Sequence, residues 1–447
     1  MPTPAETAQR LLEAARRAGA EAADALVVQG ASSSIEVRGG RLEEATRAEG
    51  IDLGLRVLIG RRQAVASSSD AREATLAAMA ERAVAMAREA PEDPSAGLAE
   101  PGLLAQARDM GALELADPSP EPEPAALEAE ARAAEAAALA VPGVTQVEAA
   151  GAGWSRHEVF LAATNGFEGG YARTSRGLSV GAISGTGTGM ERDWDYDSRV
   201  WGADLRGAEE IGRTAGERAA ERAGARKPAT GAFPVLFDER VAASLVGHLL
   251  QAINGQAVAR GASFLRDAMG TPVLPAGMSL REDPHRPRLS TSKLWDAEGL
   301  PTQARAIVED GRLVAWTLDL ASARRLGMPS TANASRSPGG TPSPAVTAVE
   351  LTQGEASRED LIRDMGEGLL VTSLLGSTVN PNTGDYSRGA SGFWVEGGAI
   401  SHPVNECTIA GNLRDMLRRT VPANDARPWL SRVVPSLLVE GMTVAGT

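Results

Sequence analysis

The stretch TGDYSRGASGFWVEGGAISHPVNECTIAGNLRDM, residues 383–416, carries the most distinctive structural pattern in this sequence. Glycines alternate along it with bulky or charged side chains, including Tyr386, Arg388 and Trp394. The pattern predicts a β-hairpin that turns at Gly397-Gly398, followed by a helix that Asn412 caps. Glycine inside a strand indicates that another backbone comes close, either a packed neighbour or a bound extended peptide.

The residues around this stretch predict a large β-rich domain over residues 229–447. A short buried strand is predicted at Pro234 to Phe237, and Asp238 can cap the helix that follows it. That helix contains SLVGHLLQAING, residues 244–255, and has an apolar face with three- and four-residue spacing. His248 lies at the flank of this apolar stripe.

Two smaller lobes are predicted before this domain, at residues 1–115 and 116–228. Each follows the order helix, antiparallel strands, helix, so the expected fold class is α+β. In the first lobe the strands lie between residues 22 and 69, with a hairpin turn at Gly39-Gly40. Asp70 is expected to cap the next helix, with Glu73 at the capping-box position.

Composition bounds the possible functions. The net charge is −13 and no basic stripe is present, so the electrostatic signature of a nucleic-acid-binding protein is missing. Cys407 is the only cysteine, which excludes an intramolecular disulfide and is compatible with a reducing compartment. The first 20 residues lack the apolar core of a signal peptide, and no apolar run is long enough to span a membrane. We therefore expect a cytoplasmic protein.

The histidines do not form a recognisable metal motif. They are single and far apart in the chain, at positions 157, 248, 285 and 402, and the sequence has no HExxH motif and no cysteine pair. A zinc site would need ligands that converge from distant segments. Isolated histidines are most often ordinary hydrogen-bonded or surface side chains.

Three other segments contain residues that are found in catalytic or binding sites. GLSVG, residues 177–181, matches the pattern of a serine nucleophile, but it lies within alternating strand residues rather than on a strand–helix turn. The glycine-rich run SGTGTGMERD, residues 184–193, lacks the spacing of a phosphate-binding loop. MERDWDYDSR, residues 190–199, is a charge cluster with two aromatic residues, typical of a solvated edge or an interface.

Four blocks of the sequence, in the expected order, resemble the PmbA/TldE family. They are SSSIEVRGGRLEEATRAEGIDLGLRVLIGRRQAVASSSD (32–70), MERDWDYDSR (190–199), LVGHLLQAINGQAVARGASFL (245–265) and the stretch at 383–416. The resemblance implies one subunit of the TldD/TldE zinc peptidase system of bacteria and archaea, in which the two subunits pair and share a fold. The sister subunit, TldD, holds the metal with an H-E-x-x-x-H helix and a distant cysteine. The complex cleaves unfolded or extended peptides, including peptide-antibiotic precursors and an antitoxin.

The sister's zinc motif can be compared with this chain position by position. Aligned on RGAS (260–263) and WVEGG (394–398), its ligands and glutamate fall on or near Val246, Gly247, Gln251 and Gly389. These residues cannot replace a histidine–cysteine zinc set, and no carboxylate is left to activate water. We therefore expect no catalytic residue and no metal in this chain, and a zinc ion in the TldD-type partner.

The resemblance also suggests how this chain contributes to cleavage. We expect a heterodimer with a TldD-type subunit, in which this chain helps to grip an extended peptide by its backbone. Candidate contacts to the peptide or the partner are His248, Asn254, Asp385, Tyr386, Arg388 and Trp394. Two alternatives stay open: a self-sufficient peptidase with an atypical site, and a homodimer that binds peptides without cutting them.

Overall fold

The computed structural model describes residues 2–446, apart from the side chain of Ser377. The helices are α1 Pro4–Ala18, α2 Glu73–Glu89, α3 Pro124–Leu139, α4 Ala208–Glu221, α5 Glu239–Ala252, α6 Gly255–Ala259, α7 Leu320–Leu326, α8 Arg358–Met365 and α9 Leu413–Arg418. The strands of the N-terminal half are β1 Ala22–Arg38, β2 Arg41–Ile59, β3 Arg62–Ser68, β4 Val144–Ala163, β5 Glu168–Ser184 and β6 Glu191–Arg199. Within the described residues, no helix is both long enough and apolar enough to cross a membrane.

The C-terminal half contains the remaining strands. They are β7 Gly231–Phe237, β8 Leu280–Glu282, β9 Arg305–Glu309, β10 Arg312–Leu313, β11 Ala334–Ser335, β12 Ser343–Pro344, β13 Val349–Leu351, β14 Gly368–Val379, β15 Asp385–Glu396, β16 Ala399–Asn412, β17 Thr420–Pro422, β18 Arg432–Val433 and β19 Leu437–Ala445. The mixture of helices and sheets confirms the expected α+β class.

One antiparallel sheet runs through both expected N-terminal lobes. Its strand order is β3-β2-β1-β4-β5-β6, so β1 joins the strands of the first lobe to those of the second. The hairpin at Gly39-Gly40 is confirmed, and both glycines have the positive φ angles that a two-residue turn needs, +60° and +69°. The expected cap at Asp70 is wrong, because α2 begins after Arg72 and the Asp70 carboxylate instead binds Arg72 and Thr75.

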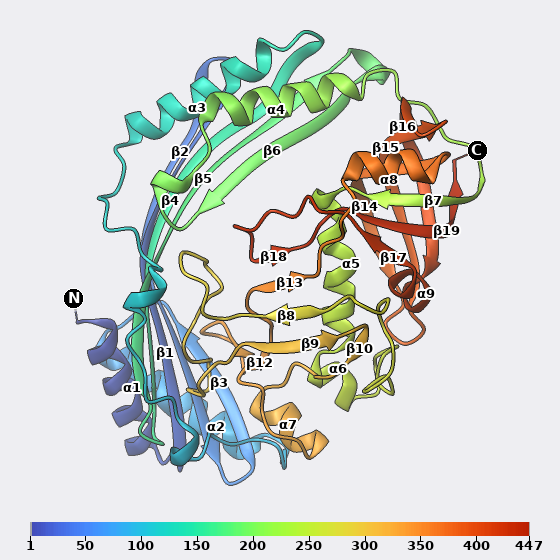
Figure 1. Ribbon diagram of the computed structural model, residues 1–447. Helices are drawn as coiled ribbons and strands as arrows, with labels where there is room; N and C mark the ends of the chain where they lie inside the picture. The colour runs from blue at the N-terminus through green and yellow to red at the C-terminus, as the bar shows by residue number, and fades with distance from the viewer. Residues whose placement is uncertain (1, 447) are drawn as a thin grey trace.

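Two pairs of helices cover one face of this sheet. Helices α1 and α2 pack against its first strands, and α3 and α4 pack against β1, β4 and β5 (Figure 1). Leu127 and Ile211 are fully buried in the second layer, where each contributes about 2 kcal/mol relative to an exposed side chain. On the opposite face, Leu26 and Phe167 pack against Trp295 of the C-terminal half. The sheet therefore links the helical layers to the C-terminal domain.

On β6, the last strand of this sheet, acidic side chains are buried and aromatic side chains are partly exposed. Asp193, Asp195 and Asp197 are buried, whereas Trp194 and Tyr196 are about half exposed. The three carboxylates form ion pairs with arginines from the strand itself, the segment after it, α4, the residue that follows α4, and α5: Arg199, Arg206, Arg218, Arg222 and Arg240. The charge cluster at residues 190–199 is therefore an internal interface, in which each buried aspartate has a paired charge.

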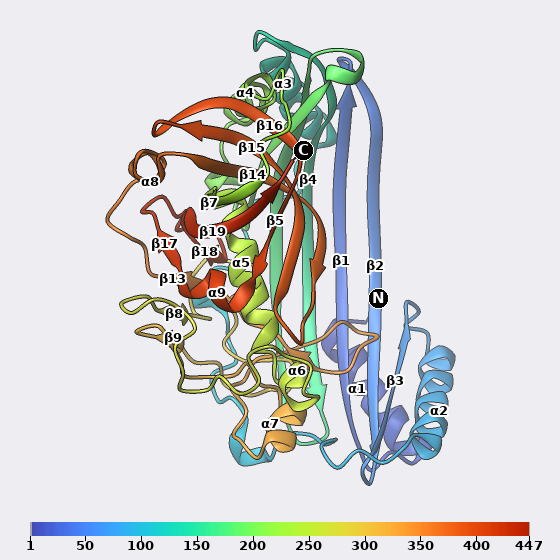
Figure 2. The same ribbon diagram turned by 90° about the vertical axis from the view of Figure 1, so that its right-hand side faces the viewer.

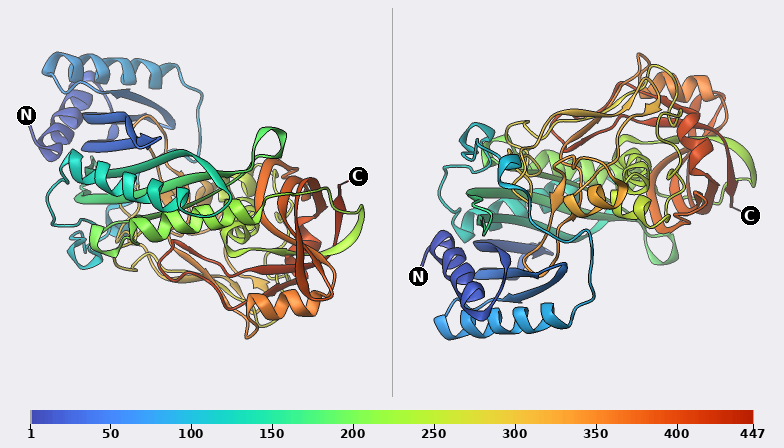
Figure 3. Two further views of the ribbon diagram at one scale, coloured as in Figure 1. Left: turned by 90° about the horizontal axis from the view of Figure 1, so that it is seen from above. Right: turned by 90° about the horizontal axis from the view of Figure 1, so that it is seen from below.

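The C-terminal domain is built around a second six-stranded sheet. Its order is β16-β15-β14-β7-β19-β17, and an additional pairing of β16 with β19 closes the sheet on itself. Helix α5 packs its apolar side chains against this closed sheet. Seen from above and below, the N-terminal lobe and the closed sheet lie at opposite ends of the molecule (Figure 3).

The hairpin turn and the two helix caps that the C-terminal sequence predicts are confirmed. The hairpin between β15 and β16 turns at Gly397-Gly398, and the side chains of Asp238 and Asn412 cap α5 and α9. The glycine pattern of β15 reflects close packing within the sheet, because a Cβ atom on Gly392 would lie 1.9 Å from the carbonyl oxygen of Leu370. At this position the neighbouring backbone is another strand of the same chain.

A buried group of charges lies between the first sheet and the C-terminal domain. Asp24 accepts hydrogen bonds from Arg56 and Arg336, so it joins β1 to the segment after β11. Nearby, Glu298 is almost fully buried and accepts a hydrogen bond of 2.8 Å from the backbone N–H of Leu320. Burial, reinforced by the neighbouring Asp296 carboxylate, raises the pKa of Glu298 to about 8.

The raised pKa of Glu298 predicts a pH-dependent stability. A carboxyl group with a raised folded-state pKa stabilises the fold below its unfolded pKa and loses that contribution as pH rises through about 8. Between these two values, this one group lowers the free energy of unfolding by about 1.4 kcal/mol per pH unit. A Glu298→Gln variant, which cannot ionise, should therefore lose less stability than the wild type between pH 5 and 8.

Urea unfolding at several pH values measures this effect. Glu309→Gln, at an exposed glutamate, is the matched control and should keep the wild-type pH slope. Equal slopes for the wild type and Glu298→Gln would contradict the prediction.

Candidate functional site

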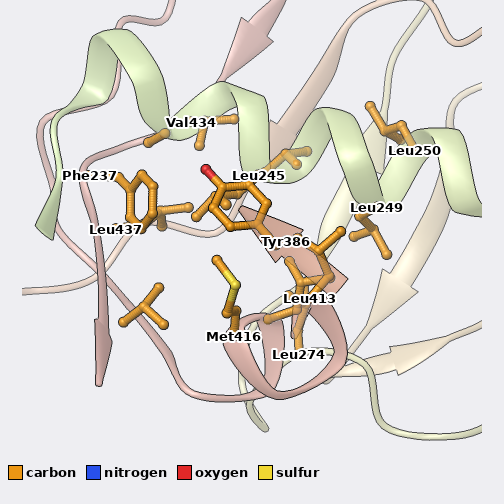
Figure 4. Packing of buried hydrophobic residues seen from close by; sticks show 14 of the residues in the cluster. Phe237, Leu245, Leu249, Leu250, Leu274, Tyr386, Leu413, Met416, Val434 and Leu437 are labelled. Atoms are coloured by element: carbon orange, nitrogen blue, oxygen red, sulfur yellow. The ribbon is translucent and has the colours of Figure 1, made fainter. Parts of the chain in front are cut away.

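Helix α5 and strand β15 bring two of the predicted site residues together. The rings of His248 and Tyr386 meet edge to face, with their centroids 5.8 Å apart. Figure 4 shows Tyr386 beneath α5, among Leu245, Leu249 and Met416. Arg388 lies two residues after Tyr386 on the same strand, close enough for its charge to act on both rings. The structure thus assembles a histidine, a tyrosine and an arginine from two distant segments.

Three polar atoms of this cluster lack a well-formed hydrogen bond to any described residue. His248 is only 8% exposed, yet neither ring nitrogen makes a hydrogen bond of good geometry with a described residue, although the Gln251 side chain lies beside the ring. The Tyr386 hydroxyl likewise makes none, although the Arg388 side chain lies close to it. Leaving such groups buried without a partner costs about 1–3 kcal/mol each. Unused buried donors and acceptors at one place are typical of a site that receives a ligand or ordered water.

The electrostatics of the cluster favour neutral rings beside a positive charge. Burial lowers the pKa of His248, the Arg388 guanidinium lowers it further, and the nearby Gln251 side chain acts in the opposite direction. Burial raises the pKa of Tyr386 to about 12. Arg388 is partly exposed and donates a 2.7 Å hydrogen bond from Nε to the carbonyl oxygen of Gly376. The cluster suits a ligand that offers carbonyl or carboxylate oxygens.

The other three predicted contact residues have partners within the fold. Asn254 caps α6 through its side-chain oxygen and donates a 2.9 Å hydrogen bond to the carbonyl oxygen of Pro344. Asp385 binds the side chains of Thr383 and Asn412. Trp394 is buried, and its ring meets that of Phe233 at a centroid distance of 4.9 Å. These contacts give all three residues structural roles.

The positions aligned with the sister's zinc motif carry no metal-binding set. Val246 is buried in the core, Gln251 is exposed, and a Cβ atom on Gly389 would lie 3.2 Å from that of Leu375. Across residues 2–446, no three histidine, cysteine, aspartate or glutamate side chains lie close enough to hold a metal ion. The donor chemistry of this region does not fit zinc.

Cys407 is also poorly suited to catalysis. Its Sγ atom is buried and donates a 3.1 Å hydrogen bond to the carbonyl oxygen of Ala390 on β15. Burial raises the pKa of the thiol to about 11, so very little of it is ionised near neutral pH. Cys407 therefore packs the sheet rather than acting as a nucleophile or a metal ligand.

A charged cavity between the two halves of the molecule was missed by sequence reasoning. It has a volume of about 840 Å³ and lies between α4, the start of α5, α8 and β16, with Arg218, Arg240, Arg358 and Arg427 in its wall. A second cavity, of about 360 Å³, shares Arg240 and Arg427 with it and is lined by the rings of Trp194, Tyr196 and Trp429.

One signal in the sequence could have located the aromatic wall. The order Asp-Trp-Asp-Tyr-Asp at residues 193–197 places acids and rings on opposite faces of a strand. The arginines come from four separate segments, so no local pattern could have grouped them. Together, the two cavities offer charged and aromatic surface along the junction between the sheet and the C-terminal domain.

Comparisons with known proteins identify the family. The PmbA/TldA metallopeptidase models match residues 23–87 (domain 1), 117–225 (central domain) and 230–446 (C-terminal domain). A protein of Escherichia coli O157:H7 named metalloprotease PmbA is 37% identical over 430 residues, which cover 95% of this chain and 92% of that protein.

Solved structures share the fold over the whole chain. A Bacteroides thetaiotaomicron protein described as a candidate modulator of DNA gyrase superposes with a TM-score of 0.90 at 25% identity, covering 99% of this chain and 98% of that one. TldE from Thermococcus kodakarensis superposes with a TM-score of 0.84 at 21% identity, covering 98% and 99%. On the strength of the family models and the 37% identity, the chain belongs to the PmbA/TldD metallopeptidase family.

Proposed function

We propose that this chain is the non-catalytic subunit of a two-subunit zinc metallopeptidase of the cytoplasm. Its relatives place it in a peptidase family. The observation that carries the finer assignment is the chemistry at α5 and β15, where a neutral histidine, a tyrosine and an arginine lie in the region that aligns with the sister's zinc site. In this proposal a TldD-type partner supplies the zinc, and this chain contributes to substrate binding.

The residues of the cluster suit recognition of a peptide main chain. Arg388 and the Tyr386 hydroxyl can donate to carbonyl or carboxylate oxygens, and a neutral His248 can either donate or accept. Main-chain groups are the same in every peptide, so binding through them is nearly independent of sequence. Such binding fits unfolded or extended substrates.

The two cavities at the junction of the sheet and the C-terminal domain suit the side chains of such a substrate. The rings of Trp194, Tyr196 and Trp429 provide apolar contact area, while Arg240 and Arg427, each paired with a carboxylate, provide polar groups. A wall of mixed aromatic and charged residues accommodates varied side chains without selecting one. The proposed role is therefore to hold an extended peptide while the partner cleaves it.

The metal content of the purified chain tests the proposal directly. When the chain is produced alone in zinc-supplemented cells, plasma mass spectrometry should find almost no zinc, because the donor set does not fit it. Co-expression with a TldD-type subunit should give a heterodimer that contains zinc and cleaves peptides.

Two results would instead support the alternatives. One zinc ion per chain, or cleavage by the chain alone, would favour a self-sufficient peptidase. A homodimer that protects peptides from other proteases, and that does not bind a TldD-type chain, would favour a binding protein.

An Arg388→Ala change should weaken cleavage by the heterodimer. Removing a charged donor from a peptide oxygen costs about 1.5–3 kcal/mol, so kcat/KM for an unstructured peptide should fall by at least about tenfold. Arg363→Ala on α8, which removes an exposed arginine, is the control and should leave cleavage unchanged. Cleavage kinetics of Arg388→Ala equal to those of the wild type would count against the cluster as a peptide site.

A His248→Leu change should separate stability from binding. The buried imidazole makes no well-formed hydrogen bond, so an apolar side chain of similar size should leave the free energy of unfolding unchanged or raise it by about 1 kcal/mol. The same variant should raise KM for peptide cleavage by the heterodimer. His157→Leu, at an exposed histidine on β4 outside both cavities, serves as the control and should leave KM unchanged. Marked destabilisation by His248→Leu would show that the imidazole has a structural role.

A further inference from the structure

One edge of the N-terminal sheet is open over half the length of its strand. Strand β3 pairs with β2 only from Leu53 to Ile59, so β2 has no outer neighbour from Arg41 to Gly50. Every residue from 41 to 50 is exposed. Figure 2 shows β2 at the border of the sheet, with β3 beside its lower part only. Among the described residues, β1 alone makes hydrogen bonds to the main chain of this segment.

The opposite edge of the same sheet is closed by side chains. On β6, Arg218 and Arg206 donate to the carbonyl oxygens of Trp194 and Tyr196, at 3.2 and 2.9 Å. The backbone N–H groups of Trp194 and Ser198 donate to the carboxylates of the residues before them, at 2.8 and 3.1 Å. Side chains that use up the edge groups in this way block strand addition. The contrast singles out β2 as the edge of this sheet that can pair.

The charges along the open edge are self-complementary. At alternate positions of RLEEATRAEG, residues 41–50, the strand carries Glu43, Ala45, Arg47 and Glu49. In an antiparallel pair of two copies with Ala45 on the two-fold axis, Glu43 of each copy faces Arg47 of the other. Moving the axis by one residue in either direction would place Glu43 against Glu49, or Arg41 against Arg47. Like charges directly opposite one another are unfavourable, so the sequence selects one register.

We propose that a second copy of this chain pairs with β2 over residues 41–50 in this register. The two N-terminal sheets then join into one continuous antiparallel sheet across a two-fold axis. The present partners of these charges are intramolecular pairs at the surface, Arg38 with Glu43 and Arg47 with Glu49 and Glu121. Such exposed pairs contribute little stability and can rearrange on association. The proposal rests on the sheet edge alone and does not depend on the proposed peptidase role.

A charge exchange across the axis tests both the surface and the register. Sedimentation equilibrium of the wild-type chain, from micromolar to hundreds of micromolar, should show a monomer–dimer equilibrium. Glu43→Arg and Arg47→Glu each turn two attractive pairs into two repulsive ones, so each should raise the dimer Kd by about tenfold or more. The double variant E43R/R47E restores both pairs and should recover the wild-type Kd.

Two controls make the outcome decisive. Arg10→Glu on the exposed side of α1 should leave the Kd unchanged. Circular dichroism and thermal unfolding establish that each variant is folded. A monomeric wild type, single variants with the wild-type Kd, or a double variant that stays monomeric would each overturn the proposal. Sedimentation equilibrium measures only the molecular mass of the assembly. If two copies do not pair through β2, the tests of zinc content and peptide cleavage therefore keep their meaning.

Discussion

The ion pairs of Asp193 hold the two halves of this molecule in a fixed relation. Its carboxylate lies on the edge strand β6 and binds Arg222 after α4 and Arg240 on α5. The same α5 arginine also binds Asp238, the residue that caps this helix. Removing one partner from a buried pair of this kind typically costs about 3–5 kcal/mol. The position of α5, and therefore of His248, depends on charges supplied by the N-terminal sheet.

This dependence explains why the two cavities lie where the two halves meet. The charged cavity is bounded by α4 on one side and by α5, α8 and β16 on the other. The aromatic wall comes from β6 and from Trp429 near the C-terminus. Neither half could form this surface alone. The side chains of a surface at such a junction can change while the backbone framework stays the same.

Sequence reasoning succeeded where the determining contacts are local. The caps at Asp238 and Asn412 and the turns at Gly39-Gly40 and Gly397-Gly398 each depend on a few neighbouring residues, and all four are present. Asp70 was misjudged as a cap because its carboxylate is engaged by Arg72 and Thr75. The arginines around the β6 aspartates could not be assigned, because their grouping arises only when distant segments fold together. The sequence separates His248 from Tyr386 by more than a hundred residues, and only the fold shows that their rings touch.

The burial of Cys407 has a practical consequence for the study of this protein. The chain has one native thiol, and it lies inside the closed sheet with a raised pKa. A cysteine introduced on the surface would therefore be far more reactive toward maleimide or nitroxide reagents than the native one. Site-specific spin labels or fluorophores could be attached without first removing Cys407 and disturbing the strand pair it bridges. The molecule is thus well suited to distance measurements by spectroscopy in solution.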